Sequence, residues 1–364
     1  MDRREFLLSG CTLGLAACAG EARAATDWLD LPSRPSRRAA AGLLLALARA
    51  GEASGAPLLA AGRRGIVVAS ADDGRSWQQV PTPVTVTLTA LCAVAGSAYA
   101  AGHDGVVLKS ADAGRTWRRL FDGREGNALT AAAAQRRFSA SRKDADARLA
   151  LEDIDATLRF GPANPLFGIA ARVKDGRETV IAVGAFGQVF RSRDGGGQWE
   201  SLLDRLDNPD NLHHNAIALA PSGAWLITSE AGRVYVSPDA GESWRRAETG
   251  YNGALFGVVD APSGQDALWA HGFAGSLFAS RDGGLTWQGL PRLGRLPLVA
   301  GARNAAGHVA VVGLDGRVHV NDGAGWRVLG DRVAGLAAAL CAGGTGWIAA
   351  GDKGVQRLSG EAQG

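Results

Sequence analysis

The chain has 364 residues, of which 51 are Gly and 10 are Trp, and its formal net charge at pH 7 is only +3. A charge this small gives no electrostatic reason to expect nucleic-acid binding, and a hydrophobic content of 46% is enough to bury a large core. Abundant Gly without a collagen period indicates an all-β fold with many tight turns.

The first 24 residues are predicted to be an export signal rather than part of the fold. Residues 3–7 (RREFL) fit a twin-arginine pattern, and the apolar stretch 6–19 is too short to span a membrane. Two processing sites remain open: residues 22–24 fit a cleavage site, whereas residues 15–18 fit a lipobox that would leave Cys18 lipidated. We therefore expect an exported, periplasmic protein, either free or lipid-anchored to the envelope.

One pattern, S-x-D-x-G-x-x-W, recurs five times without error along the rest of the chain, and we call it the Asp-box. An apolar strand, a Gly-x-x-Gly turn and a second apolar strand precede it. The Asp carboxylate can accept backbone N–H groups, and the Trp can pack over the hairpin. Four short strands in about 40 residues is the size of a propeller blade. We expect the following Asp-box residues to be structural: Asp72, Asp112, Asp194, Asp239, Asp282, Trp77, Trp117, Trp199, Trp244 and Trp287.

A sixth, shorter copy ends at Trp326, and a seventh copy that begins at Leu340 lacks its fourth strand. Residues 28–32 (WLDLP) look like a terminal strand that would fill the gap. We thus predict a seven-bladed β-propeller over residues 26–358, closed by pairing of the two chain ends. Cys92 and Cys341 fall in blades 2 and 7, which would not touch, so free thiols are expected.

Residues 126–160 interrupt the repeat between blades 2 and 3. Within them, residues 128–138 and 143–160 are predicted to be two helices, the second with Leu151, Ile154 and Leu158 on one stripe. A cap packed on the propeller and a docking surface for a partner are two alternatives for this helical insertion.

The order of the Asp-boxes and of the segments between them resembles the photosystem II stability/assembly factor family, in the form found in proteobacteria. The resemblance covers about residues 27 to 358 and rests on residues 28–32 (WLDLP), 160–166 (FGPANPL), 183–187 (VGAFG), 206–213 (LDNPDNLH) and 253–257 (GALFG). It implies an exported, YCF48-like, non-catalytic propeller that binds a membrane-protein precursor or assembly intermediate. In bacteria without photosystem II, the client would be another envelope complex, such as a transporter.

Propeller geometry separates the Asp-box turns from the turns between second and third strands, which lie on the opposite face with the blade-to-blade links. Polar residues there would surround the channel mouth and suit an extended peptide or a partner's loop, although hydration alone also explains them. Arg pairs such as Arg37-Arg38 suggest a patch for acidic segments or anionic lipid, or else solvated strand edges. The candidate partner-binding residues are Arg63, Arg64, His103, Asp104, His213, His214, Asn215 and Asn252.

A glycan-binding or sialidase-like propeller is the alternative function, and a purely structural scaffold held by a lipidated Cys18 is a third. A sialidase needs a Tyr nucleophile, and the chain has only Tyr99, Tyr235 and Tyr251. A glycan binder needs aromatic platforms, for which only Phe186, Tyr251 and Phe273 qualify. The short supply of suitable residues favours a non-enzymatic protein.

Metal and cofactor sites are not expected. Adjacent residues of a strand point to opposite faces, so His213 and His214 are poorly placed to share one ion. The Gly-x-x-Gly turns recur in every blade, which marks them as structural turns rather than phosphate-binding loops. Nothing in the pattern indicates an obligate oligomer, so a monomer is predicted.

Overall fold

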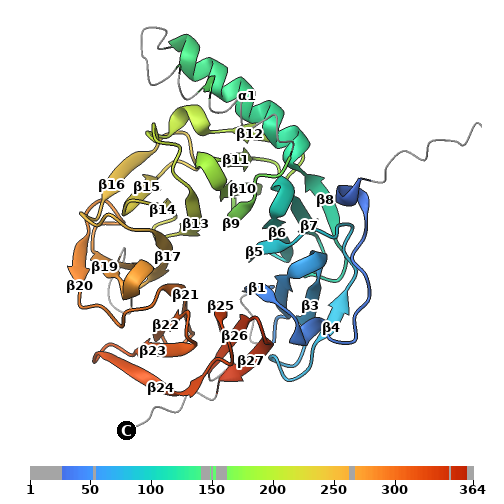
Figure 1. The fold of residues 1–364 in the computed structure, drawn as a ribbon, viewed down its shortest axis with the longest axis vertical. Coiled ribbons are helices and arrows are strands. Elements are labelled where there is room, and N and C mark those ends of the chain that lie inside the picture. The colour runs from blue at the N-terminus through green and yellow to red at the C-terminus, as the bar shows by residue number, and fades with distance from the viewer. Residues whose placement is uncertain are drawn as a thin grey trace, which may run out of the picture.

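The computed structural model describes residues 27–51, 55–140, 148, 151–152, 162–261, 267–343 and 346–358, and the predicted signal with Cys18 lies outside this range. Seven antiparallel sheets stand around a central channel (Figure 1). The predicted seven-bladed β-propeller is therefore confirmed. In every blade the strands are hydrogen-bonded in chain order, and Figure 1 shows that the first strand lines the channel.

The first four blades each have four strands. Blade 1 contains β1 (Leu44–Arg49), β2 (Leu58–Gly62), β3 (Val67–Ser70) and β4 (Gln78–Val80). Blade 2 contains β5 (Leu88–Val94), β6 (Ser97–Gly102), β7 (Val107–Ser110) and β8 (Arg118–Phe121). Blade 3 contains β9 (Leu166–Lys174), β10 (Arg177–Gly184), β11 (Val189–Ser192) and β12 (Glu200–Ser201). Blade 4 contains β13 (His214–Leu219), β14 (Trp225–Ser229), β15 (Arg233–Ser237) and β16 (Arg245–Glu248).

The last three blades include one that is incomplete. Blade 5 contains β17 (Leu255–Asp260), β18 (Leu268–Gly272), β19 (Leu277–Ser280) and β20 (Gln288–Leu290). Blade 6 contains β21 (Leu298–Arg303), β22 (Val309–Gly313), β23 (Arg317–Asn321) and β24 (Trp326–Arg332). Blade 7 has three strands in the described part of the chain, namely β25 (Ala337–Ala342), β26 (Trp347–Gly351) and β27 (Gly354–Leu358).

Each Asp-box is a turn between the third and fourth strands of its blade, held by its own side chains. In blade 2, Asp112 Oδ1 accepts from the Ser110 hydroxyl at 2.7 Å and from the backbone N–H of Thr116 at 2.9 Å. The Trp117 indole N–H donates to the carbonyl of Gly114 at 3.1 Å, and the ring packs between blades 1 and 2. The other Asp-box Trp residues also pack against apolar clusters: Trp77, Trp199, Trp244 and Trp287.

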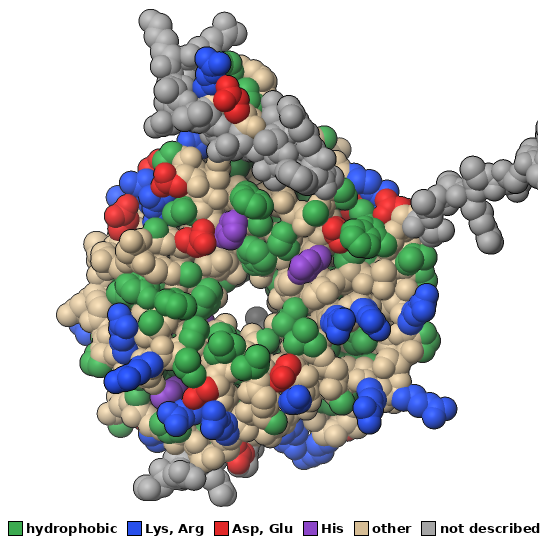
Figure 2. All heavy atoms as spheres, viewed as in Figure 1, with side chains coloured by type: hydrophobic (Ala, Val, Ile, Leu, Met, Phe, Trp, Pro, Cys, Tyr) green, Lys and Arg blue, Asp and Glu red, His purple; other side chains and the backbone are tan. Residues whose placement is uncertain are grey.

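The propeller therefore has two unlike faces. The Asp-box face carries the Asp-box turns and the turns between first and second strands. The loop face carries the turns between second and third strands and the links between blades, and it faces the viewer in Figure 2. The loop face comprises the turns 63–65, 103–105, 185–187, 230–232, 273–275, 314–316 and 352–353, with the links 42–43, 81–87, 202–213, 249–254, 291–297 and 333–336 and the described ends, 122 and 162–165, of the link that contains the helical insertion.

Glycine makes the loop-face turns possible at two positions. In blade 1, a Cβ on Gly62 would lie 2.2 Å from the Leu43 carbonyl oxygen, and one on Gly65 would lie 2.0 Å from that of Val84. Gly65 and the preceding Arg64 both have positive φ, at 67° and 59°, and the N–H of Ile66 donates to the Arg63 carbonyl. This is the hairpin turn with two left-handed central residues, which favours Gly at the second of them.

Closure of the ring differs from the prediction. Residues 28–32 do not form a terminal strand: Trp28–Asp30 is a short 3-10 helix, and no described strand pairs with the outer edge of β27. Pro32 lacks a backbone N–H and so cannot donate to a strand ladder. Instead, residues 27–41, which we call the strap, run along the outer strand β4 of blade 1 and end in the 3-10 helix Ala39–Ala41 against β27 (Figure 1).

The two ends of the strap are anchored by packing and by charge. At the first end Leu29 is completely buried between blades 1 and 2, and Asp30 forms a 2.6 Å ion pair with Arg119. At the second end, Ala39 packs with Ala339 and Ala350 of blade 7 in an apolar cluster that also includes side chains of blade 1. Blade 7 thus joins blade 1 through side-chain packing rather than through a shared sheet.

The helical insertion begins earlier than predicted. Helix α1 spans Gly123–Ala140, whereas the predicted first helix covers residues 128–138 within an insertion starting at 126. Gly126 is tolerated in the first turns because the helix lies so close to blades 2 and 3 that a Cβ there would be 3.2 Å from Phe121 and 3.3 Å from Phe190. Of the predicted second helix, the described residues Arg148, Leu151 and Glu152 are helical, and its remainder lies outside the described residues.

The insertion packs against the side of the propeller. Ala133 and Ala134 of α1 are buried with Leu203 of the next link, and Leu151 packs against the same cluster. Arg136 pairs with Asp204 at 2.8 Å. Figure 1 shows α1 alongside the outer strands of blade 3. These contacts support the cap alternative for the inner side of α1.

Cys92 and Cys341 are free thiols, as expected.

Candidate functional site

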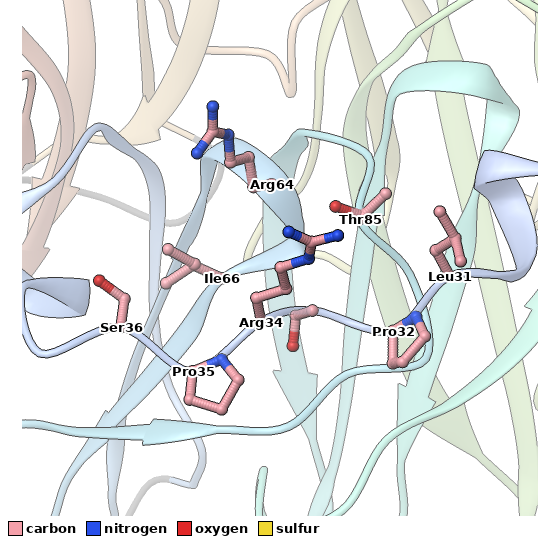
Figure 3. Close-up of a pocket in the computed structure, with 9 residues that line it drawn as sticks. Leu31, Pro32, Arg34, Pro35, Ser36, Arg64, Ile66 and Thr85 are labelled. Atoms are coloured by element: carbon pink, nitrogen blue, oxygen red, sulfur yellow. The ribbon is translucent and has the colours of Figure 1, made fainter.

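A groove of about 720 Å³ opens on the loop face between the strap and blade 1 (Figure 3). The strap forms one wall with residues 31–36, and Arg64, Ile66 and Thr85 form the other. Figure 3 shows the Arg34 side chain extending from the strap into the space beside blade 1, whereas Arg64 extends from its turn away from the strap. The groove is therefore bounded by chain segments that come from two separate parts of the sequence.

Hydrogen bonds hold the strap in place beside blade 1. The N–H of Ser33 donates to the Thr82 carbonyl at 3.0 Å, and the N–H of Thr82 returns a bond to the Ser33 hydroxyl at 3.0 Å. Gln79 accepts from the N–H of Ser36 at 2.7 Å and donates to the Arg34 carbonyl at 2.9 Å. Because the strap uses its backbone groups on blade 1, its Arg side chains are left to face the groove and solvent.

The groove and its surroundings carry uncompensated positive charge. Five exposed arginines lie in the strap and in the blade 1 turn, and none of them takes part in an ion pair within the described residues: Arg34, Arg37, Arg38, Arg63 and Arg64. A guanidinium presents planar pairs of N–H donors that match a carboxylate or a phosphate. This arrangement can hold an anionic group of an extended ligand.

Two predicted residues of blade 2 occupy the neighbouring turn. His103 is exposed, whereas Asp104 is buried with only 8% of its surface accessible and has a φ of 57°. Burial raises the pKa of the Asp104 carboxyl above its ordinary value. Asp104 therefore offers little surface to a partner.

The consecutive histidines separate, as the strand geometry predicts. The half-buried His213 ring accepts from the Phe186 N–H at 2.9 Å and meets the Phe186 ring edge-on at 4.9 Å. His214 is completely buried against Tyr235, and burial lowers its pKa to about 3. The His214 ring is thus neutral at physiological pH and has no exposed surface for a partner.

Asn215 also has a structural contact. Its amide donates to the Leu255 carbonyl of the next blade at 3.0 Å. Asn252 is exposed on the link before blade 5, where the neighbouring Tyr251 donates to the Phe273 carbonyl at 3.1 Å. The candidate set is therefore divided: the blade 1 arginines lie beside the strap, whereas the candidates of the other blades do not line the groove, and two of them, Asp104 and His214, are buried.

Sequence reasoning missed Arg34 and the groove. The run of Pro and Arg at residues 31–38 was the available signal, since Pro lacks the N–H that a strand ladder needs and therefore argues against a regular strand there. The strand predicted at residues 28–32 overlaps the start of this run, so the run was not recognised as a separate segment. Arg64 was among the predicted residues. The strap residues that form the opposite wall of the groove lie about 30 positions earlier in the sequence, and only the path of the strap brings them near Arg64.

Three solved structures share this fold. The structure described as YCF48 bound to D1 peptide superposes with a TM-score of 0.60 at 13% identity, covering 91% of this chain and 100% of that one. YCF48 from Cyanidioschyzon merolae gives 0.58 at 14% identity, covering 89% and 97%. Selenomethionine-substituted virginiamycin B lyase from Staphylococcus aureus gives 0.63 at 11% identity, covering 90% and 97%. No protein-family model and no curated protein matches the chain.

These similarities establish the propeller fold, which binding proteins and at least one lyase share. For the sialidase-like alternative, Tyr99 and Tyr235 are completely buried, and the Tyr251 hydroxyl is engaged with Phe273. Among the described residues, no three His, Cys, Asp or Glu side chains are grouped to hold a metal ion. Within the same range, no helix has the length and apolar character needed to cross a bilayer.

Proposed function

We propose that this protein is a non-catalytic binding factor that holds an extended segment of a membrane-protein precursor or assembly intermediate on its loop face. The observation that carries the proposal is the groove between the strap and blade 1. Arg34 and Arg64 line a space large enough for several residues of an extended chain, and neither pairs with a carboxylate among the described residues.

The chemistry of the groove specifies the segment. Pro32 and Pro35 cannot donate from their backbones, so the strongest donors along this wall are guanidinium groups. We infer that the bound segment is acidic or ends in a free carboxylate. The solved complex of YCF48 with a D1 peptide supports a peptide ligand for a propeller of this shape.

The likeness to YCF48 and the sequence resemblance together support an assembly role of the photosystem II stability/assembly factor kind. In a host without photosystem II, the client would be another envelope complex such as a transporter. The twin-arginine pattern at residues 3–7 supports export to the periplasm, with Cys18 as a lipid anchor or with cleavage after Ala24. On this proposal the protein acts as a monomer.

The groove can be tested with labelled peptides and fluorescence anisotropy. An acidic peptide with a free C-terminus should bind, and its C-terminally amidated form should bind more weakly. Arg34→Glu/Arg64→Glu should weaken binding by at least about tenfold, because charge-assisted hydrogen bonds contribute about 1.5–3 kcal/mol each. The matched control is Arg75→Glu/Arg115→Glu, which reverses two exposed arginines on the Asp-box face. Equal weakening by both double variants would refute the groove as the site.

The client can be sought by crosslinking in native membranes. Wild type should recover one membrane complex or precursor that Arg34→Glu/Arg64→Glu fails to recover. Recovery of no protein, combined with a hit on a glycan array, would replace the assembly proposal with the carbohydrate alternative.

A further inference from the structure

Large apolar side chains that remain exposed are distributed unequally between the two faces. Five of the ten in the described range lie in turns and links of the loop face, and two more, Trp28 and Leu31, lie in the strap. Two are near turns of the Asp-box face, Val173 and Leu285, and Val328 is on the outer strand β24. The five on the loop face are Leu43 (37% exposed), Phe186 (46%), Phe273 (53%), Leu296 (49%) and Leu336 (55%).

These side chains surround the channel rather than forming one patch. They come from the loop-face ends of blades 1, 3, 5, 6 and 7. Figure 2 shows hydrophobic side chains around the channel mouth on this face. A single peptide or a small folded partner covers one contiguous patch, whereas a flat bilayer can meet all parts of a ring at once.

Basic residues accompany the apolar ones. Arg292 and Arg295 are exposed in the link that carries Leu296. Arg63 is also exposed, and its own backbone N–H donates to the Leu43 carbonyl. In the described part of the chain, none of these three arginines takes part in an ion pair. Figure 2 shows Lys and Arg side chains farther from the channel than the hydrophobic ring. Exposed apolar residues beside free arginines are typical of a surface that binds anionic membranes.

We propose that the loop face docks on an anionic lipid bilayer, with apolar side chains such as Phe186, Phe273 and Leu336 entering the interface and the arginines contacting lipid phosphates. This goes beyond the peptide-binding proposal and is independent of it. It would place the groove at the membrane surface, where segments of a membrane-protein client emerge.

The test is sedimentation of the purified propeller with phosphatidylcholine vesicles, with and without phosphatidylglycerol. Binding should require phosphatidylglycerol and should fall as NaCl is raised. Arg292→Glu/Arg295→Glu should weaken binding at least fivefold per arginine, and Leu296→Ser/Leu336→Ser should also weaken it. The matched control is Arg281→Glu/Leu285→Ser, which changes the same residue types in the Asp-box turn of blade 5.

Three results would overturn the proposal: no sedimentation of wild type with anionic vesicles, equal binding to neutral vesicles, or equal loss in the control variant. All substituted side chains are exposed, so thermal unfolding should be unchanged and loss of fold can be recognised separately. Peptide binding in solution should persist in Leu296→Ser/Leu336→Ser, because neither residue lines the groove. Failure of the membrane proposal is thereby distinguishable from failure of the peptide proposal.

Discussion

The two faces of the propeller build repeated turns in opposite ways. On the Asp-box face the turn is held by side chains, since the same Ser–Asp hydrogen bond recurs in all five Asp-boxes at 2.7 to 2.8 Å. On the loop face the turn is held by the backbone, and the residue before the Gly that ends the turn differs from blade to blade. That residue has φ between 53° and 59° at Arg64, Asp104, Phe186, Ala231 and Ala274.

This contrast explains where function can be located. Changing an Asp-box side chain removes a hydrogen bond on which the turn depends, so the residues of that face have little freedom. Changing a side chain at the tip of a loop-face turn leaves the main-chain bonds intact, such as the bond from the Ile66 N–H to the Arg63 carbonyl. The loop face can therefore carry arginine in one blade and phenylalanine in another on one backbone geometry.

The largest effect is expected from the backbone of the loop face. Gly65→Ala places a Cβ in a left-handed conformation and 2.0 Å from the Val84 carbonyl oxygen. Strain and overlap together should lower the free energy of unfolding by on the order of 3 kcal/mol. Urea unfolding followed by Trp fluorescence measures this change.

A glycine near the Asp-box face is the control. Gly96 has a φ of 84°, but a Cβ there would have no atom within 4 Å. Gly96→Ala should therefore cost only the conformational strain, about 1 kcal/mol. If Gly65→Ala is no worse than Gly96→Ala, close packing of the link against the turn is not what requires glycine at position 65.

Because the Asp-box turns depend on carboxylate side chains, the stability that they contribute should fall at acidic pH. The hydroxyls of Thr116 and Ser110, with the Thr116 N–H, lower the pKa of Asp112 to about 2. The unfolded carboxyl has a pKa of about 3.9, so the stabilisation is complete above that pH and is lost as pH falls through about 2. Near neutral pH, Asp112→Ala should lower the free energy of unfolding by about 1–2 kcal/mol, which is the usual effect of removing a carboxylate that accepts backbone and hydroxyl hydrogen bonds.

The measurement is the difference in urea unfolding between wild type and Asp112→Ala as a function of pH. The difference should be constant from pH of about 5 upward and shrink below pH of about 4. Thr116→Val, which removes one hydroxyl and keeps the backbone bond, should give a smaller difference with the same pH trend. A difference that does not change with pH would mean that the carboxylate charge is unimportant to the turn.

The smallest effect, with the opposite sign, is expected from a loop-face side chain. Arg64 has φ 59° at the first central turn position, where Asn and Asp are better suited. Arg64→Asn should raise the free energy of unfolding by up to about 1 kcal/mol while weakening acidic-peptide binding. Calorimetry measures the change in stability, and fluorescence anisotropy on the same sample measures peptide binding. A loss of stability in Arg64→Asn would contradict the idea that this side chain can change without weakening the turn.

Short-range chemistry made much of this molecule predictable. The Asp-box, the Gly-x-x-Gly turn and the alternation of strands are complete within about 40 residues each, so their repetition predicts seven blades. The placement of the blade 1 turn residues Arg63 and Arg64 followed from strand order alone. The burial of His214 and Asp104 did not, because it depends on the side chains that neighbouring elements place against them.

The sequence by itself determined the blade, its turns and the number of blades, because each is built from hydrogen bonds and packing between residues close together in the chain. Only the tertiary structure decided how the ring closes, where α1 begins and what forms the groove. A terminal strand at residues 28–32 is locally plausible, yet burial of Leu29 between blades 1 and 2 and the Asp30–Arg119 ion pair draw the segment along blade 1. The Asp30–Arg119 ion pair joins residues 89 positions apart, and no local pattern encodes it.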